Sequence, residues 1–547
     1  MDTTAQRGRQ KGWIDAIILD LLRQMRWSFL PPLMVYFAFG FTGLTAIVGT
    51  FFVKEYLDLS AAYLAGLAFW AGIPWALKMP LGHLVDIIWR WKWVLVWFGA
   101  GLVAFSVGIM YLVLTAPQMM QAVMPLASWY VASTIIAPCG LVIQDAVADA
   151  MSVEAVPKTD AQGAPLPEDQ EKAMHVTMQM LGRFALITGT LAVALLNIVM
   201  FSGIENLTQP QKAEIYATIY LTALIIPVIS VSGVVLGGLQ KRLKRRRLIA
   251  AGLTPQEAFE ATEARDEATQ VNPWYFIGGG AFVVLTLIIG LGQVPYGQEI
   301  IFAGSMTIVL LLMRQLMQAL PQAQARMLMG TAAIIFAFRA TPLPGEGLTW
   351  FNIDVLGFDQ QFLSVLSLIT AVITLAAMLV LRPVMARRSI VYVIVVLTLA
   401  AGVLSLPNLG LYYGVQTWTA AVTGGIVDAR FIAILDTAVE SPLAQIAMIP
   451  MLAWIARNAP VALKATFFAV MASFTNLALS ASRLGEKYLN QIFTVTREVR
   501  DGDTGVIQTA ANYAELGMLL ITVAILTVGI PLLVVWMVQR SPLKTTE

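Results

Sequence analysis

The stretch CGLVIQDAVADAMSVEAV, residues Cys139–Val156, ends a long apolar run, yet it contains Asp145, Asp149 and Glu154. About 20 apolar helical residues cross the hydrocarbon core of a bilayer, and an ionised carboxylate at that depth is costly. At about 1.5 Å per residue, a helix that enters near Ala122 has crossed about 33 Å by Ile143. Asp145 and Asp149 are therefore expected at the cytoplasmic rim of the membrane, one turn apart on one helix face.

Apolar runs of this kind recur along the whole chain. The protein has 547 residues, of which 58% are hydrophobic and only 12% are charged. We count fourteen runs that are long enough, or nearly so, to cross a membrane. They must be helices, because no alternating pattern of the kind that builds a membrane barrel is present. The composition predicts an all-α polytopic membrane protein with about 14 transmembrane helices.

The reactive residue types are scarce. One Cys and two His exclude a disulfide framework within the chain and make a Cys- or His-based metal site unexpected. The sequence has no phosphate-cradling Gly-x-x-x-x-Gly-Lys loop, no zinc motif and no Gly-x-Ser-x-Gly elbow. We therefore expect no enzyme, no cofactor, no metal and no nucleic-acid partner, and energy from an ion gradient.

The two parts of the chain carry a weak internal repeat. FFVKEYLDLSAAYLAGL from Phe51 aligns with WFNIDVLGFDQQFLSVL from Trp350, and each links the first span of its part to the second. Such repeats are typical of transporters. The predicted organisation is a cytoplasmic amphipathic segment, a six-helix half, a charged cytoplasmic loop, two inserted transmembrane helices, a second six-helix half and a cytoplasmic tail. These parts are assigned to residues 1–29, 30–239, 240–273, 274–320, 321–540 and 541–547, respectively.

The distribution of Lys and Arg predicts the orientation. Most of the 35 basic residues fall in segments that are cytoplasmic if both termini lie inside, as the positive-inside rule requires. The strongest signal is QKRLKRRRL from Gln240, which we interpret as a stop signal in preference to a specific site for anionic lipid. We expect a multi-pass protein of a bacterial inner membrane, with both termini in the cytoplasm.

Four stretches resemble one branch of the major facilitator superfamily, the folate-biopterin transporters. They are GIPWALKMPLGHLVDIIWRWKW from Gly72, QDAVADAMSVE from Gln144, FAFRATPLPGEGLTWFNIDVLGFDQQFL from Phe336, and IPMLAWIARNAPVALKATFFAVMASFTNLALSASRLGEKYL from Ile449. The resemblance implies the major facilitator fold, with two six-helix halves and alternating access. It also implies a folate or pteridine cargo that is moved with protons.

Two other functions remain open at this stage. The inserted pair of helices also resembles the anhydromuropeptide permeases, a related branch that shares part of the signature around Asp145. A transporter-like assembly factor, which binds a partner and moves no solute, is the alternative from another class. Uptake of labelled folate and of labelled muropeptide separates the first two, and the third predicts a partner on purification.

The carboxylates at the cytoplasmic rim are predicted to form a gate. Asp86 ends the second span at the same depth as Asp145 and Asp149. We expect these three groups to pair with basic residues in one state and to release them in another. The alternative is that they are interfacial charges that only cap helices.

Arginines within the spans are predicted to meet an anionic substrate. Arg183 lies about ten residues, or about 15 Å, into its helix, and Arg339 lies in the outer half of its own. Asp436 and Glu440 are expected at the depth of Arg339, so these groups form an external gate, a substrate site or a static ion pair. Aromatic rings of the cargo would stack on Trp129 and Tyr130.

Overall fold

The computed structural model describes residues 25–57, 59–157, 167–263, 273–292, 294–318, 320–385, 389–446, 464–500 and 507–544. Residues 1–24 of the predicted amphipathic segment lie outside the described residues. So do residues 264–272 of the charged loop and residues 447–463, which hold parts of two predicted spans. All statements on structure below refer to the described residues.

Helices make up nearly the whole first part of the chain. The α-helices before the charged loop are α2 (Leu30–Phe41), α3 (Ala46–Tyr56), α4 (Ala61–Gly72), α5 (Lys78–Ile87), α6 (Lys92–Thr115), α7 (Pro117–Val123), α8 (Leu126–Ala155), α9 (Glu168–Met200), α10 (Gln209–Ala223) and α11 (Ile225–Ala250). Short 3-10 turns join or extend them at η2 (Trp27–Phe29), η3 (Thr42–Thr45), η4 (Ile73–Leu77), η5 (Trp89–Trp91) and η6 (Ile204–Asn206). Local sequence explains several starts: the Ser60 hydroxyl caps α4, and Thr208 with Gln211 forms a capping box at α10.

The second part is also helical, with one small exception. Its α-helices are α12 (Pro255–Glu263), α13 (Pro273–Leu291), α14 (Gly297–Met317), α15 (Gln322–Arg339), α16 (Glu346–Asp354), α17 (Gln360–Met385), α18 (Ile390–Leu404), α19 (Leu406–Tyr412), α20 (Val415–Thr423), α21 (Ala429–Ile446), α23 (Lys464–Ile492) and α24 (Leu516–Gln539). The exception is an antiparallel pair of strands, β1 (Val499–Arg500) and β2 (Ile507–Thr509). This hairpin was not expected in an all-helical chain. Its strands have only two and three residues, which is too short for the alternation of apolar and polar residues that marks a strand in a sequence.

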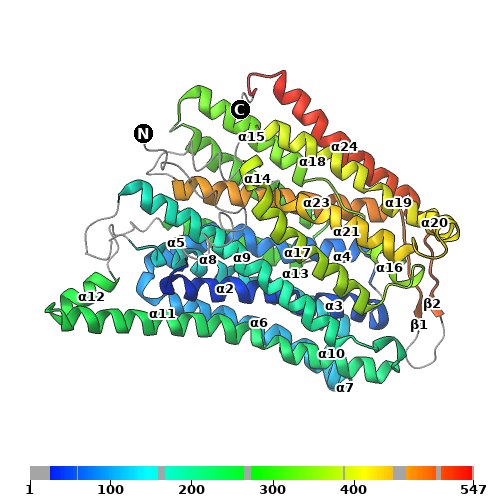
Figure 1. The fold of residues 1–547 in the computed structure, drawn as a ribbon, viewed down its shortest axis with the longest axis horizontal. Helices are drawn as coiled ribbons and strands as arrows, with labels where there is room; N and C mark the ends of the chain where they lie inside the picture. The colour runs from blue at the N-terminus through cyan, green and yellow to red at the C-terminus, as the bar shows by residue number, and fades with distance from the viewer. Residues whose placement is uncertain are drawn as a thin grey trace, which may run out of the picture.

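The long helices run roughly side by side along the molecule (Figure 1). The end of α11 and the short helix α12 lie at one end of the bundle, whereas β1, β2, α16 and α20 lie at the other (Figure 1). We call the second of these the hairpin end. Nine described helical segments are long and apolar enough to cross a membrane, and 277–290 and 297–311 form two shorter apolar helices. The predicted helical membrane fold is thereby confirmed.

The two predicted halves meet mainly along two pairs of helices. In the interface, α9 packs on α17, and α4 packs on α23. The inserted helices are not confined to one half, because α13 packs against α5 while α14 contacts both α23 and α4. The inserted pair therefore lies against the seam between α4 and α23.

Small residues allow the closest helix contacts. Gly99 on α6 faces Gly140 on α8, and a Cβ atom added to either would lie 2.5 Å from the carbonyl oxygen of the other. Gly40 and Gly189 produce the same close approach between α2 and α9. Lipid tails are as apolar as leucine, so helix association in a membrane depends on such packing rather than on the hydrophobic effect.

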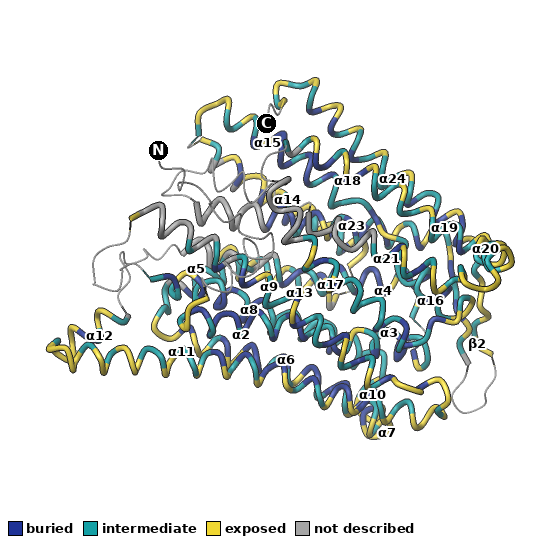
Figure 2. The backbone as a smooth tube through the Cα atoms, in the orientation of Figure 1, coloured by how far each residue is buried: buried dark blue, intermediate teal, exposed yellow. Residues whose placement is uncertain are grey.

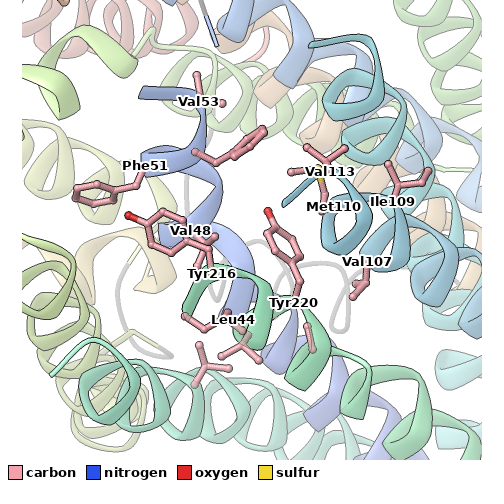
Figure 3. Packing of buried hydrophobic residues seen from close by; sticks show 14 of the residues in the cluster. Leu44, Val48, Phe51, Val53, Val107, Ile109, Met110, Val113, Tyr216 and Tyr220 are labelled. Atoms are coloured by element: carbon pink, nitrogen blue, oxygen red, sulfur yellow. The ribbon is translucent and has the colours of Figure 1, made fainter. Parts of the chain in front are cut away.

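The largest buried cluster among the described residues lies mainly in the first half, with Trp350 of the second half as a member. Tyr216 and Tyr220 of α10 point toward α3, where Val48 and Phe51 meet them, and Met110 of α6 covers the other side (Figure 3). Exposed residues instead line the outer surfaces of α11, α12 and α20 (Figure 2). Exposed apolar side chains such as Val228 and Val235 of α11 and Trp418 of α20 suit contact with lipid, whereas α12 and the end of α11 are polar and charged.

Candidate functional site

Lys78 joins two carboxylates at the end of α8. Its ammonium group lies 2.5 Å from Oδ2 of Asp145 and 2.8 Å from Oδ2 of Asp149. The lysine stands where η4 passes into α5, and the two aspartates are one turn apart on α8. The Asp145 side chain is 15% exposed and that of Asp149 is 44% exposed. The sequence placed the aspartates on one face correctly, but it gave Lys78 no role.

Tyr36 completes this group, which we call the carboxylate cluster (Lys78, Asp145, Asp149 and Tyr36). The Tyr36 hydroxyl donates to Oδ1 of Asp149 at 2.7 Å, so α2 is linked to α8. Asp145 also lies within the electrostatic reach of Arg183 on α9. The Asp86 side chain, the third member of the predicted gate, lies outside the described residues. The described part of the predicted gate thus connects α2, α5 and α8, with α9 nearby.

Glu154 ties three helices together beyond this cluster. It accepts from Lys92 of α6 at 2.7 Å and from Lys241 of α11 at 2.5 Å. Lys92 also lies 3.3 Å from the ring centre of Trp89. Glu154 is a helix residue rather than a loop residue, because α8 continues to Ala155. A helix end carries a carboxylate stably when two ammonium groups reach it.

A cavity of about 300 Å³ lies further along the bundle. Its lining comes mainly from α3, α4, α6 and α8, and Glu346 of α16 adds a residue from the second half. Tyr130, predicted as a ring contact, is part of this lining. The polar side chains around the cavity belong to Thr42, Thr45, Thr50, Ser106, Tyr130, Ser133, Thr134, Tyr220 and Glu346. The volume and the mixture of hydroxyls with apolar groups are those of a site for a small polar molecule.

Glu346 is the acidic residue of this lining. No hydrogen bond or ion pair holds its carboxylate among the described residues. Burial raises the pKa of Glu346 above the usual glutamate value; Glu486 raises it further, and Arg483 opposes the shift. Arg483 is itself engaged with Glu486 at 2.7 Å. Sequence reasoning missed Glu346, although it lies within the quoted stretch from Phe336 and its charge next to apolar spans was a usable signal.

Arg183 and Arg339 approach each other from different halves. The two guanidinium groups are close enough to repel one another, and neither forms an ion pair within the described part of the chain. The buried Nε of Arg339 has no hydrogen-bond partner there. Arg183 is exposed and lies within the electrostatic reach of Asp145, whereas the charge of Arg339 is unfavourable in a helical bundle unless an anion or water meets it.

The remaining predicted residues lie elsewhere. Asp436 is buried and accepts from the Asn408 side chain at 3.0 Å, so it does not pair with Arg339 as the shared depth had suggested. The Glu440 side chain lies outside the described residues. Trp129 donates from its indole nitrogen to the carbonyl of Met120 at 3.0 Å and packs on the buried cluster of the first half. A packing role accounts for Trp129, whereas its neighbour Tyr130 faces the cavity.

A profile of the BT1 family matches residues 40–546 of the chain. A search of curated proteins finds no match.

Several solved structures share the fold. One is a POT family transporter in complex with 5-aminolevulinic acid, with a TM-score of 0.59, 11% identity, and coverage of 94% of this chain and 96% of that one. Another is a POT family transporter with a thioalcohol conjugated peptide, at a TM-score of 0.57, 12% identity and the same coverage. A nucleoside transporter matches with a TM-score of 0.52, 12% identity, and coverage of 93% and 98%. At such low identity the likeness concerns the fold alone, and it confirms the major facilitator architecture.

The comparisons correct the sequence-based assignment to the folate-biopterin branch. The solved structures named above are POT family and nucleoside transporters, and none of these three is a folate-biopterin transporter. The assignment is withdrawn on that finding, and with it the folate or pteridine cargo. Short motifs around helix ends are shared widely among transporters because similar packing and charge pairing recur there, so they fix a fold better than a substrate.

Proposed function

The chain belongs to the BT1 family, and on that premise we propose that it is a secondary-active transporter that moves a small anionic or zwitterionic solute by alternating access. The two moving bodies would be the predicted halves, residues 30–239 and 321–540. The protein would lie in a bacterial inner membrane with both termini in the cytoplasm. No nucleotide motif is present in the sequence, so an ion gradient is the proposed source of energy.

The observation that carries this proposal is the cavity of about 300 Å³. Helices of the first half form most of its wall, and Glu346 belongs to the second. A solute in that cavity would contact both halves, so a movement of one half against the other would change its access to either side. Hydroxyl groups of Thr and Ser residues would replace part of the lost hydration.

Arg183 and Arg339 support an anionic group on the solute. A guanidinium group presents a planar fork that matches a carboxylate or a phosphate. Neither group forms an ion pair among the described residues, although Asp145 lies within the electrostatic reach of Arg183, so an anion between the two arginines would relieve their repulsion. The solutes named for two structural neighbours, 5-aminolevulinic acid and a conjugated peptide, are small polar molecules and guide the choice of candidates.

Glu346 supports protons as the coupling ion. A carboxyl group that lines a cavity and has a raised pKa changes charge at a pH nearer to neutrality than a solvated glutamate does. Its protonation would remove a negative charge from the cavity at the moment an anionic solute enters. Binding of the proton and of the anion would then favour each other.

The test is uptake by the purified protein in liposomes with an imposed pH gradient. The panel contains 5-aminolevulinic acid, a dipeptide, a nucleoside and an anhydromuropeptide. We expect uptake of at least one anionic or zwitterionic member and its loss when the pH gradient is dissipated. Failure of uptake and of counterflow for the whole panel, together with a partner that remains bound on purification, would favour the assembly factor instead.

A further inference from the structure

A set of contacts at the hairpin end joins the two halves. Lys54, near the end of α3, lies 2.6 Å from Oδ1 of Asp354 at the end of α16. The Tyr513 hydroxyl donates to the other oxygen of Asp354 at 2.6 Å. Lys54 belongs to the first half, whereas Asp354 and Tyr513 belong to the second. An ion pair therefore crosses between the halves at this end.

Arg497 makes a second and more buried connection. It stands just before β1 and is 3% exposed. Its guanidinium group donates to the backbone oxygens of Val53, at 2.6 Å, and of Lys54 and Leu57. These carbonyls lie in the last turn of α3 and just beyond it.

The chemistry of a helix end explains why an arginine fits there. The last carbonyls of a helix have no partner within the helix, and they carry the negative end of its dipole. A guanidinium group offers several donors in a fixed plane and keeps its charge, so it can satisfy more than one carbonyl at once. Trp350 of the second half lies 5.2 Å below the guanidinium carbon, which limits the access of water to these bonds.

From this geometry we infer that Arg497 is a latch that holds the two halves closed at the hairpin end. Alternating access requires this end to open in another state, so the bonds of Arg497 to α3 must break in each cycle. The latch rests on the proposed function in that respect. It acts through backbone atoms of the first half, and no substitution at Val53, Lys54 or Leu57 would remove its acceptors.

The test measures the separation of the halves without any solute. Spin labels are placed at Tyr63 and Val355, exposed positions in the first and second halves, in a background where Cys139 is replaced by Ser. The parent protein is expected to show mainly one short distance by double electron–electron resonance. Arg497→Gln should shift the ratio of open to closed forms by about tenfold toward the longer distance, since charged hydrogen bonds are lost.

Arg430→Gln is the matched control. Arg430 pairs with Asp359 at 2.9 Å, is exposed, and both residues belong to the second half. This variant should keep the parent distance distribution. Lys54→Gln provides a milder variant of the crossing contacts should Arg497→Gln fail to fold, and it should raise the longer distance to a smaller degree.

The outcomes separate the latch from the proposed function. An unchanged distance distribution in Arg497→Gln, or in Lys54→Gln if the first variant does not fold, overturns the latch even where uptake is observed. A shifted distribution in a protein that shows no uptake or counterflow of the solute panel and keeps a bound partner on purification leaves the latch in place and refutes the transport proposal.

Discussion

Replacing Lys78 by Gln removes the positive charge shared by Asp145 and Asp149. The contact with Asp145 is short, at 2.5 Å, and the Asp145 side chain is only 15% exposed. Loss of one partner from a buried ion pair costs about 3–5 kcal/mol, and from an exposed pair about 0–1 kcal/mol. The partial exposure of Lys78, 29%, places this contact between the two limits, at about 2 kcal/mol.

The contact with Asp149 adds less. The Asp149 side chain is 44% exposed, so water screens its charge. The Lys78–Asp149 contact therefore contributes less than about 1 kcal/mol to the free energy of unfolding. Tyr36 continues to donate to Asp149 after the change. The total expected loss for Lys78→Gln is therefore about 2–3 kcal/mol, caused mainly by an unmatched charge on Asp145.

The assay is thermal unfolding in detergent. A thiol-reactive dye that labels Cys139 when the protein unfolds reports the unfolding temperature. Cys139 is the only cysteine of the sequence and lies on α8, between the cavity-lining residues Ala137 and Leu141. Lys78→Gln should lower the unfolding temperature by several degrees. Lys244→Gln, which removes an exposed lysine of α11, should leave it unchanged.

A double variant decides between a charge effect and a packing effect. Adding Asp145→Asn to Lys78→Gln removes the unmatched carboxylate, so most of the stability should return. A double variant as unstable as the single one would refute the reasoning, because the loss would then come from the shape of the lysine side chain.

Three further predictions concern the cavity and the helix contacts. Arg339→Lys should reduce uptake of an anionic solute at least tenfold although the charge remains, because lysine lacks the planar fork; full uptake by Arg339→Lys or by Arg339→Gln would refute a role of this guanidinium group in binding. Uptake should fall as the pH rises through the raised pKa of Glu346, because the neutral form of its carboxyl group is lost. Glu346→Gln should flatten the dependence of uptake on pH, whereas the control Glu214→Gln, at an exposed position, should leave it unchanged. Gly140→Leu should abolish folded protein in a size-exclusion assay, because even a Cβ atom would lie 2.5 Å from the carbonyl oxygen of Gly99; a monodisperse variant would mean that α6 and α8 can separate.

Apolar runs in the sequence determined the helical membrane fold. Length and hydropathy suffice there, because every backbone polar group in a bilayer must be satisfied within a helix or a barrel. The same reasoning placed Asp145 and Asp149 on one face of a helix, one turn apart. Substrate binding by Arg183 and Arg339 stays a prediction, because the Arg183 side chain is exposed and neither arginine lines the cavity of Glu346.

Partners across the bundle were decided only by the tertiary structure. Helical periodicity gives the depth and the face of a residue, but it does not state which helix lies opposite. Lys78 was therefore not assigned to the two aspartates, and Asp436 was expected beside Arg339 although it bonds to Asn408. Arg497 is the clearest example of a partner that the sequence does not predict, because it donates to backbone oxygens of residues more than 400 positions earlier. Every residue has a backbone carbonyl, so the sequence does not distinguish these acceptors from others.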